Sequence, residues 1–225
     1  MEGLILVDKP QNITSHDVVD FVRKRLGIRR VGHGGSLDPL ATGLLIILIG
    51  KTTKLFSQLS ELDKEYEATL KVGISTDTGD IEGRILKEED YYYLSQEKIE
   101  EVFKKFRGEI LQVPPMVSAL RYKGKRLYEL ARKGKDVPRK PRKVKIYSLE
   151  IRKIYLPFID FFVHCSKGTY IRKLAHDIGE ELGCGACIVR IRRIRVGPFS
   201  IKEAVKLEEI NESIIRTFSS FPLNK

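Results

Sequence analysis

The strands predicted from this sequence come from two kinds of apolar pattern. Residues 41–50 (ATGLLIILIG) are apolar almost throughout, which is typical of a strand buried on both faces. Residues 64–74 (KEYEATLKVGI) alternate between polar and apolar, and Tyr66, Leu70 and Val72 share one face, which is typical of a half-buried strand. Runs of the same types predict further strands at 3–10, 143–156, 159–166 and 187–197.

The predicted helices carry start and stop signals at their ends. We expect Ser15 to cap a helix that Gly27 ends, and Ser95 to cap a second one that Gly108 ends. Thr169 is the expected cap of a third helix. The predicted helical segments, together with the tail that begins at residue 206, are 15–27, 51–61, 95–108, 126–134 and 169–183.

Strands and helices are mixed without a steady strand–helix–strand rhythm. This order favours an α+β fold with a mixed, mostly antiparallel central sheet flanked by helices and loops. The chain has 225 residues, 42% of them hydrophobic, which is enough to bury a large core. We therefore expect a single domain spanning residues 1–225.

The charge of the chain is strongly basic and unevenly distributed. The net charge is +11, and the segment 121–145 alone holds twelve Lys and Arg residues against two acids. A solvated surface normally mixes both signs, so such a segment favours contact with a nucleic acid over a role in solubility alone. Gly and Pro interrupt the segment, which argues against an amphipathic membrane helix.

Other features of the composition limit the class of protein. The longest apolar run is too short to cross a membrane, and the N-terminus lacks the pattern of a signal peptide, so we expect a cytoplasmic protein. Cys165, Cys184 and Cys187 cannot all pair within one chain. The spacing of Cys184 and Cys187 permits a zinc site with Cys165 or a histidine, but no second paired motif exists, and buried thiols are favoured.

The segment 31–43 (VGHGGSLDPLATG) holds more glycine, proline and charged chemistry than a plain turn needs. Asp38 stands between a Gly-Gly pair and Pro39, directly before the buried strand. Asp before Pro is also common in ordinary turns. The chain lacks a phosphate-binding loop, a dinucleotide-binding fingerprint, a serine nucleophile elbow and paired metal-binding histidines. A carboxylate on a shaped loop beside a basic surface is what remains.

Several motifs in order along the chain resemble the TruB family of pseudouridine synthases, which act on the T-arm of tRNA. They are DKP at 8–10, SLDPLATG at 36–43, DKEY at 63–66 and CSKGTYIRKLAHDIGEELGCGA at 165–186. The resemblance extends from Leu4 to Gly197. It implies the pseudouridine synthase fold with an inserted basic lobe, at about residues 115–145, that clamps RNA.

The resemblance also assigns roles to individual residues. Asp38 matches the catalytic aspartate, Arg172 the arginine that pairs with it, and Tyr66 a tyrosine that stacks on the target base. Otherwise Tyr66 would be taken for a core residue. His33 matches a histidine that helps to extrude bases from the T-loop, with a loop histidine bonded to backbone as the alternative. The remaining matches are substrate-site positions (Lys9, Tyr170 and Ile191), and the expected contacts to the RNA backbone are Arg121, Lys123, Lys125, Arg126, Arg132 and Lys133.

The chain departs from the family pattern at a few positions. Gly34 stands where the family often has threonine, which removes a hydroxyl and is expected to loosen the loop. Asn12 stands where glycine is usual, and asparagine tolerates a left-handed backbone better than most residues. The chain ends about thirty residues after Gly197, so we expect no appended C-terminal RNA-binding domain.

Two functions remain in view. The resemblance implies an isomerase that converts the T-loop uridine (position 55 of tRNA) to pseudouridine. It implies a tRNA partner through the T-arm stem-loop, no metal, no small-molecule cofactor and no membrane, and a monomer is the default state. The alternative is a non-catalytic module that binds or folds tRNA. The presence of Asp38, Tyr66 and Arg172 together favours the enzyme, since a pure binder does not need them.

Overall fold

The computed structural model describes residues 1–118 and 120–217. The chain divides into two compact units. Unit 1 comprises Met1–Glu67 and the described part of Arg190–Lys225, and unit 2 comprises Ala68–Val189. Two long strands, β4 (Lys64–Val72) and β12 (Ala186–Val196), each contribute residues to both units. Both units are α+β with mostly antiparallel sheets, as the sequence predicts.

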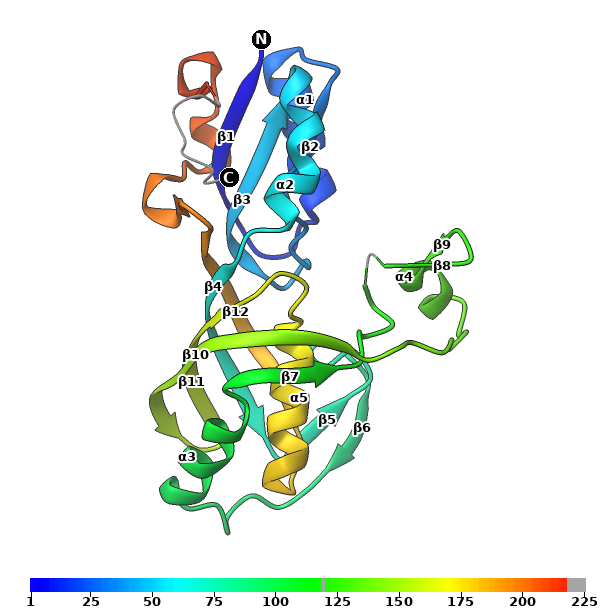
Figure 1. Ribbon diagram of the computed structural model, residues 1–225, viewed down its shortest axis with the longest axis vertical. Helices are drawn as coiled ribbons and strands as arrows, with labels where there is room; N and C mark the ends of the chain where they lie inside the picture. The colour runs from blue at the N-terminus through cyan, green and yellow to red at the C-terminus, as the bar shows by residue number, and fades with distance from the viewer. Residues whose placement is uncertain (119, 218–225) are drawn as a thin grey trace. The chain divides into compact units, whose positions relative to one another are not determined.

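Unit 1 contains a sheet in which the buried strand β3 (Thr42–Ile49) is central (Figure 1). β3 pairs antiparallel with β1 over seven residue pairs and parallel with the end of β12 at Arg192 and Arg193. Its remaining elements are α1 (Ser15–Leu26), β2 (Val31–His33), a 3₁₀ helix (Gly50–Leu55), α2 (Phe56–Ser60) and β13 (Phe199–Ser200), beside β1 (Gly3–Lys9) and β3 (Thr42–Ile49). Leu44, Ile46 and Leu48 pack with Leu59 and Phe199 in the core, so the run at 42–49 is buried as predicted.

The N-cap of helix α1 lies one residue before the predicted cap. Thr14 is the N-cap: its side chain accepts a hydrogen bond from the backbone N–H of Asp17, and Asp17 bonds back to Thr14. The prediction of Ser15 as the cap was therefore wrong. Ser15 is the first residue of the helix, and its buried hydroxyl is used in a tertiary contact instead.

The main sheet of unit 2 has the strand order β12–β4–β11–β10–β7, where β11 is Phe158–Cys165, β10 is Arg142–Tyr155 and β7 is Gly108–Gln112. Helices α3 and α5 lie against one face of this sheet (Figure 1), where the rings of Phe103 and Phe161 meet at 5.9 Å and Lys105 of α3 bonds Glu181 of α5 at 2.8 Å. Besides β4 and β12, the elements are β5 (Ile74–Thr76), β6 (Ile85–Glu88), α3 (Gln96–Lys105), β7 (Gly108–Gln112), β8 (Arg121–Tyr122), β9 (Lys125–Arg126), α4 (Leu127–Ala131), β10 (Arg142–Tyr155), β11 (Phe158–Cys165) and α5 (Ile171–Leu182).

The ends of the helices in unit 2 test two more cap predictions. Ser95 caps α3 by accepting from the N–H of Lys98, which confirms that prediction. Thr169 does not cap α5: the N-cap is Tyr170, without a side-chain bond, and the hydroxyl of Thr169 donates to Ser166 O at 2.9 Å. The start of α5 is held by tertiary contacts rather than by a local cap.

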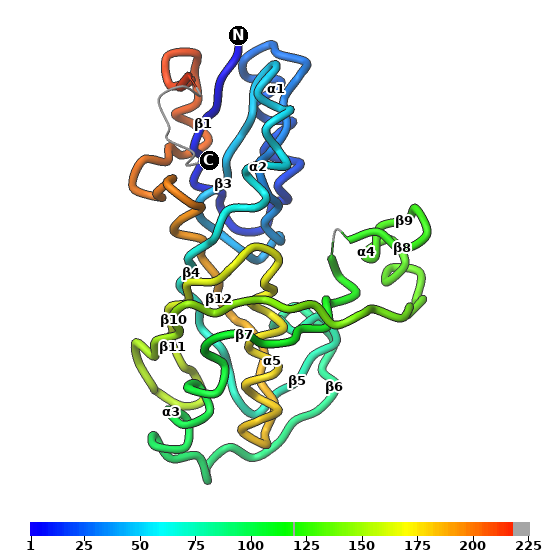
Figure 2. Tube along the Cα trace, viewed as in Figure 1, coloured from blue at the N-terminus to red at the C-terminus, as the bar shows by residue number. Residues whose placement is uncertain are grey.

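The tail of unit 1 is not the helix that the sequence predicts. Short 3₁₀ turns at Ile201–Glu203, Leu207–Glu209 and Glu212–Ile214 alternate with extended residues. The tail runs beside β1 (Figure 2), and backbone bonds join Val205 to Leu6 and Asp8, and Arg216 to Leu4. A continuous helix could not place Val205 and Arg216 along one strand edge, because its backbone groups would bond within the helix. Residues 218–225 of the predicted helical tail lie outside the described residues.

Candidate functional site

The backbone on both sides of Asp38 is held by hydrogen bonds from buried side chains. The ammonium group of Lys9 is wholly buried and donates to the carbonyl oxygens of Pro10 (2.8 Å), Ile13 (2.7 Å) and Pro39 (3.3 Å). The N–H of Asn12 also donates to Pro39 O, at 2.9 Å. The segment after β1 and the turn after Asp38 are therefore tied together.

Ser15 fixes the residue before Asp38. Its hydroxyl accepts from Leu37 N–H at 2.8 Å and donates to Leu37 O at 3.1 Å, so both backbone groups of Leu37 are satisfied by one buried side chain. Leaving a buried polar group without a partner costs free energy, so these two hydrogen bonds hold the loop to the start of α1.

Arg193 on β12 holds the segment between His33 and Asp38. Its guanidinium is buried, with 3% of the side chain exposed, and donates to Leu44 O (2.8 Å), Gly35 O (3.1 Å) and Ser36 O (3.2 Å). Burial lowers the pKa of Arg193, and the nearby Tyr66 side chain and Asp38 carboxylate act against that decrease. Arg193 thus links the loop, Tyr66 and Asp38 electrostatically.

The sequence alone assigned no role to Arg193. A signal was present: period-two alternation along the strand places Arg193 on the same side as Ile191, and both are buried.

Asp38 itself is exposed, while Leu37, Leu40 and Ala41 beside it are buried. The N–H of Ala41 donates to Asp38 O at 3.0 Å and closes the turn. An accessible carboxylate on a backbone fixed from both sides is the arrangement that a nucleophile or base requires, since its position is set before a substrate arrives.

His33 lies at the end of β2, at the other end of the same loop. Its Nδ1 accepts from Gly35 N–H at 3.3 Å, and its ring meets that of exposed Phe56 edge to face, with the centroids 6.4 Å apart. Gly34 is buried and donates its N–H to Ile46 O at 2.8 Å. A Cβ at Gly34 would lie 2.9 Å from Leu59 Cδ1, so Leu59 fills the space that a larger residue would need.

Tyr66 and Ile191, the two predicted pocket residues in the strands of unit 1, are both 8% exposed. Thr42 Oγ1 donates to Ile191 O at 3.5 Å.

Burial lowers the pKa of Lys9 to about 8, against the opposing effect of Asp38. Unit 1 therefore places His33 and Asp38 on one loop that Lys9 of β1 braces, with Tyr66 and Asp38 both near Arg193.

Arg172 and Tyr170 belong to unit 2. Arg172 is 4% exposed and donates to Thr78 O and Val117 O, each at 2.8 Å, and its guanidinium lies 3.4 Å from the carboxylate of Asp80. The predicted pairing of Arg172 with Asp38 joins the two units and stays a prediction.

Tyr170 is held through its backbone by Gln112, a residue that sequence reasoning missed. Gln112 is 1% exposed; its Oε1 accepts from Tyr170 N–H at 3.0 Å and its Nε2 donates to Tyr170 O at 3.3 Å. A buried amide that makes two bonds to one residue fixes the entry to α5 without a local cap, and nothing in the local sequence signals it.

The basic lobe lies in the chain between β7 and β10, which pair directly with one another. Within it, β8 and β9 form a short hairpin whose turn contains Lys123 at φ 48, and α4 follows (Figure 1). Arg126 and Arg132 lie over the ring of Tyr128 at 5.8 and 5.6 Å. All six residues predicted to contact the RNA backbone are exposed: Arg121, Lys123, Lys125, Arg126, Arg132 and Lys133.

The three cysteines are buried thiols, as favoured by the sequence, and burial raises the pKa of Cys187 to about 11. Within residues 1–118 and 120–217, no group of three His, Cys, Asp or Glu side chains could hold a metal ion. No helix in the same part of the chain is both long enough and apolar enough to span a membrane.

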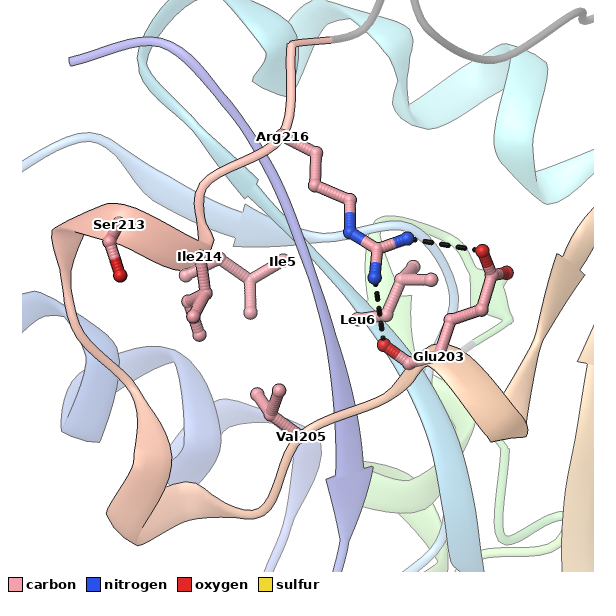
Figure 3. Close-up of a pocket in the computed structure, with 7 residues that line it drawn as sticks. All are labelled: Ile5, Leu6, Glu203, Val205, Ser213, Ile214 and Arg216. Carbon is pink, nitrogen blue, oxygen red and sulfur yellow. Dashed lines mark hydrogen bonds and ion pairs between the residues drawn. The ribbon is translucent and has the colours of Figure 1, made fainter.

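A small pocket of about 170 Å³ lies between β1 and the tail in unit 1 (Figure 3). Arg216 donates there to the carboxylate of Glu203 (3.2 Å) and to Glu203 O (3.2 Å), and Val205 and Ile214 line the pocket with Leu6. None of the residues singled out in the sequence lies in it, so this is the covered edge of a strand and not the catalytic centre.

Comparisons with known proteins identify the family of the chain. Residues 23–171 match the TruB family pseudouridylate synthase (N terminal domain), and residues 172–219 match the tRNA pseudouridylate synthase B C-terminal domain. A tRNA pseudouridine synthase B of Clostridium tetani is 50% identical over 97% of this chain and 75% of its own length. One of Geotalea uraniireducens is 48% identical over 93% of this chain and 67% of its own length.

Solved structures give the same answer for the fold. A Cbf5–Nop10–Gar1 complex matches with a TM-score of 0.72 and 34% identity, over 92% of this chain and 53% of that one. An H/ACA RNP bound to a substrate RNA that contains 2'-deoxyuridine matches with a TM-score of 0.69 and 30% identity, over 92% and 51%. The chain thus spans about half the length of these solved chains. The family model covers well over half of the sequence, and the chain belongs to the TruB family of pseudouridylate synthases.

Proposed function

We propose that this chain converts the T-loop uridine of tRNA, at position 55, to pseudouridine. The observation that carries the proposal is the exposed carboxylate of Asp38 on a backbone braced by Lys9, Ser15 and Arg193. The names of the relatives support tRNA as the substrate. We further propose that the chain works as a monomer in the cytoplasm. It needs no cofactor, because the reaction only rearranges atoms of the uridine.

The chemistry is an isomerisation in which one bond replaces another. The bond between N1 of uracil and C1' of ribose breaks, the uracil turns within the site, and a bond between C5 and C1' forms. The proton on C5 is lost, and N1 gains a proton. Asp38 acts as the nucleophile or base in this exchange, and a rigid loop limits the motion that the carboxylate would otherwise have to lose on reaching the transition state.

The other site residues support this step. Arg172 pairs with Asp38 and keeps the carboxylate ionised and oriented. Tyr66 stacks on the target base, and Tyr170 and Ile191 enclose it. His33 fills the stack that the extruded base leaves, since extrusion costs a few kcal/mol. Lys9 keeps the turn after Asp38 in place.

The lobe residues act on the phosphates. Arg121, Lys123, Lys125, Arg126, Arg132 and Lys133 neutralise the backbone of the T-arm stem-loop. We propose that residues 1–225 act as one catalytic domain, with this lobe at about 115–145 as its RNA clamp.

The test measures release of tritium from a T-arm stem-loop that carries 5-tritiated uridine, because pseudouridine has the same mass as uridine. The wild-type chain is expected to release tritium, and Asp38→Asn to release none while binding the RNA as before. Asp90→Asn, which removes an exposed acid of unit 2, serves as the matched control and should retain full release.

Two results would contradict the proposal. A wild-type chain that binds the stem-loop without releasing tritium would make it a non-catalytic tRNA-binding or tRNA-folding module. Normal release by Asp38→Asn would remove Asp38 from the chemistry.

A further inference from the structure

Two β-bulges shape one face of the β10–β11 ribbon, here called the outer face, which carries Tyr147, Tyr155, Phe162 and His164. The register between the strands shifts between Ile146 and Ser148, and again between Ile151 and Lys153. Tyr147 and Arg152 are thus the extra residues of β10. A bulge re-aims a side chain relative to a regular strand, and here each extra side chain comes to lie against a ring of β11.

The first of these contacts is a three-membered stack. The rings of Tyr147 and His164 lie 4.7 Å apart with an interplanar angle of 39°. The ammonium of Lys145 lies 5.4 Å from the centroid of the Tyr147 ring. Tyr147 remains exposed, with 43% of the residue accessible. Its ring therefore offers a surface on which a base can stack beside the ammonium of Lys145.

The second group lies further along the same ribbon. Arg152 sits over the ring of Phe162 at 5.2 Å, and Lys153 over the ring of Tyr155 at 5.1 Å. Tyr155 in turn lies 5.7 Å from Phe158 and is 42% exposed. Each exposed aromatic ring of this outer face therefore has a cation beside it.

The charges on the outer face favour an anionic partner. Its cations are Lys143, Lys145, Arg152 and Lys153. Its acids are Glu150, Asp160 and, on the neighbouring strand β7, Glu109, whose carboxylate lies 3.9 Å from the ammonium of Lys143. Glu150 is paired with Arg152 at 3.1 Å, and Asp160 accepts hydrogen bonds from Thr69 and Tyr155. The acids are thus bound within the face, and Lys143 and Lys145 extend the basic segment of the lobe onto the sheet.

We propose that this outer face is a second RNA-contacting surface that stacks unpaired bases of the substrate tRNA outside the T-arm. Aromatic rings that take successive bases, with cations that follow the phosphates, are how proteins hold single-stranded nucleic acid without reading its sequence. The cores of protein–protein interfaces are depleted in charged residues, whereas each exposed ring of this face has a cation beside it. The identity of the RNA rests on the proposed function, but the stacking chemistry does not.

The experiment compares two RNAs, full-length tRNA and the isolated T-arm stem-loop. The variant is Tyr147→Ala with Tyr155→Ala, and Tyr92→Ala is the matched control, because Tyr92 is 82% exposed in an acidic segment of the same unit. We expect the double variant to bind full-length tRNA at least about fivefold more weakly, since loss of one stacked base already has an effect of this size. Its affinity for the stem-loop and its tritium release from the stem-loop should equal those of the wild type.

The outcomes separate this proposal from the proposed function. Unchanged affinity for full-length tRNA in the double variant would overturn the outer face as an RNA surface. An equal loss for both RNAs would overturn it as well, because the effect would then come from the T-arm site. Tyr147→Phe with Tyr155→Phe should bind both RNAs normally, because the rings are kept; a loss there would also contradict stacking. Failure of the proposed function would instead show as absent tritium release by the wild type.

Discussion

Arg193 is the side chain on which the shape of the Asp38 loop most depends. Its guanidinium donates to three carbonyl oxygens, those of Gly35, Ser36 and Leu44. Buried polar groups that lose their partner cost about 1–3 kcal/mol. Arg193→Met should therefore lower the free energy of unfolding by about 3 kcal/mol and reduce tritium release more than RNA binding.

Arg195→Met is the matched control for this prediction. Arg195 is exposed on the same strand and forms an ion pair with Glu65 at 3.4 Å. Such a pair is worth about 1 kcal/mol or less. Urea unfolding compares the two variants, and equal losses would contradict the bracing role of Arg193.

Lys9 provides a pH test at the same scale. Burial lowers its pKa in the folded protein to about 8, whereas the unfolded chain has the ordinary value of 10.5. The unfolded state therefore binds more protons between these two values, and stability rises with pH across this window. The penalty for burying the charged amine is fully present below pH 8 and absent above pH 10.5.

Comparison with Lys9→Met isolates this contribution. The difference in free energy of unfolding between wild type and variant should change in favour of the wild type as the pH rises from about 8 to about 10.5. Urea unfolding at a series of pH values measures it. A difference that stays constant over this window would show that the pKa of Lys9 is not lowered by folding.

At the scale of elements, Gly34 is packed between α2 and β3. Gly34 lies against Leu59 of α2, and its N–H is bonded to Ile46 of β3. Gly34→Thr should therefore destabilise the protein by about 1–2 kcal/mol, because its side chain overpacks this contact.

The same contact predicts coupling between the two positions. Leu59→Ala opens the space beside Gly34. The double variant should therefore lose less free energy of unfolding than the two single variants lose together, by at least about 0.5 kcal/mol. Urea unfolding of the four proteins gives this coupling energy. Additive losses would mean that Leu59 does not fill the space in question.

At the scale of the whole molecule, the lobe predicts how RNA affinity depends on salt. Each phosphate that a protein neutralises contributes about 0.7–0.9 to the slope of log K against log salt. Replacing Lys123, Lys125 and Arg126 by Gln should lower that slope by about 2–3. The matched control replaces the exposed lysines Lys98, Lys104 and Lys105 of α3, and filter binding over a salt series measures both. A slope unchanged from the control would exclude the lobe from phosphate contact.

Local patterns in the sequence were sufficient for most of the elements. The buried strand at 42–49, the half-buried strand from Lys64 and the cap of α3 by Ser95 depend on residues close together in the chain. The left-handed conformation of Asn12, at φ 67, is of the same kind. The motifs around Asp38 and Arg172 sufficed to suggest the family, because each is a short run of adjacent residues.

Tertiary structure decided where the chain's polar groups bind. Ser15 was predicted to cap a helix and instead holds Leu37. Arg193, which the sequence did not single out, braces Gly35 and Ser36, and the tail pairs with β1 instead of forming a helix. In each case the partner is distant in the sequence, and a buried polar group takes whichever partner the fold brings near. The sequence by itself determined the family and most of the elements, whereas the fold alone decided which side chains hold the backbone around Asp38 in place.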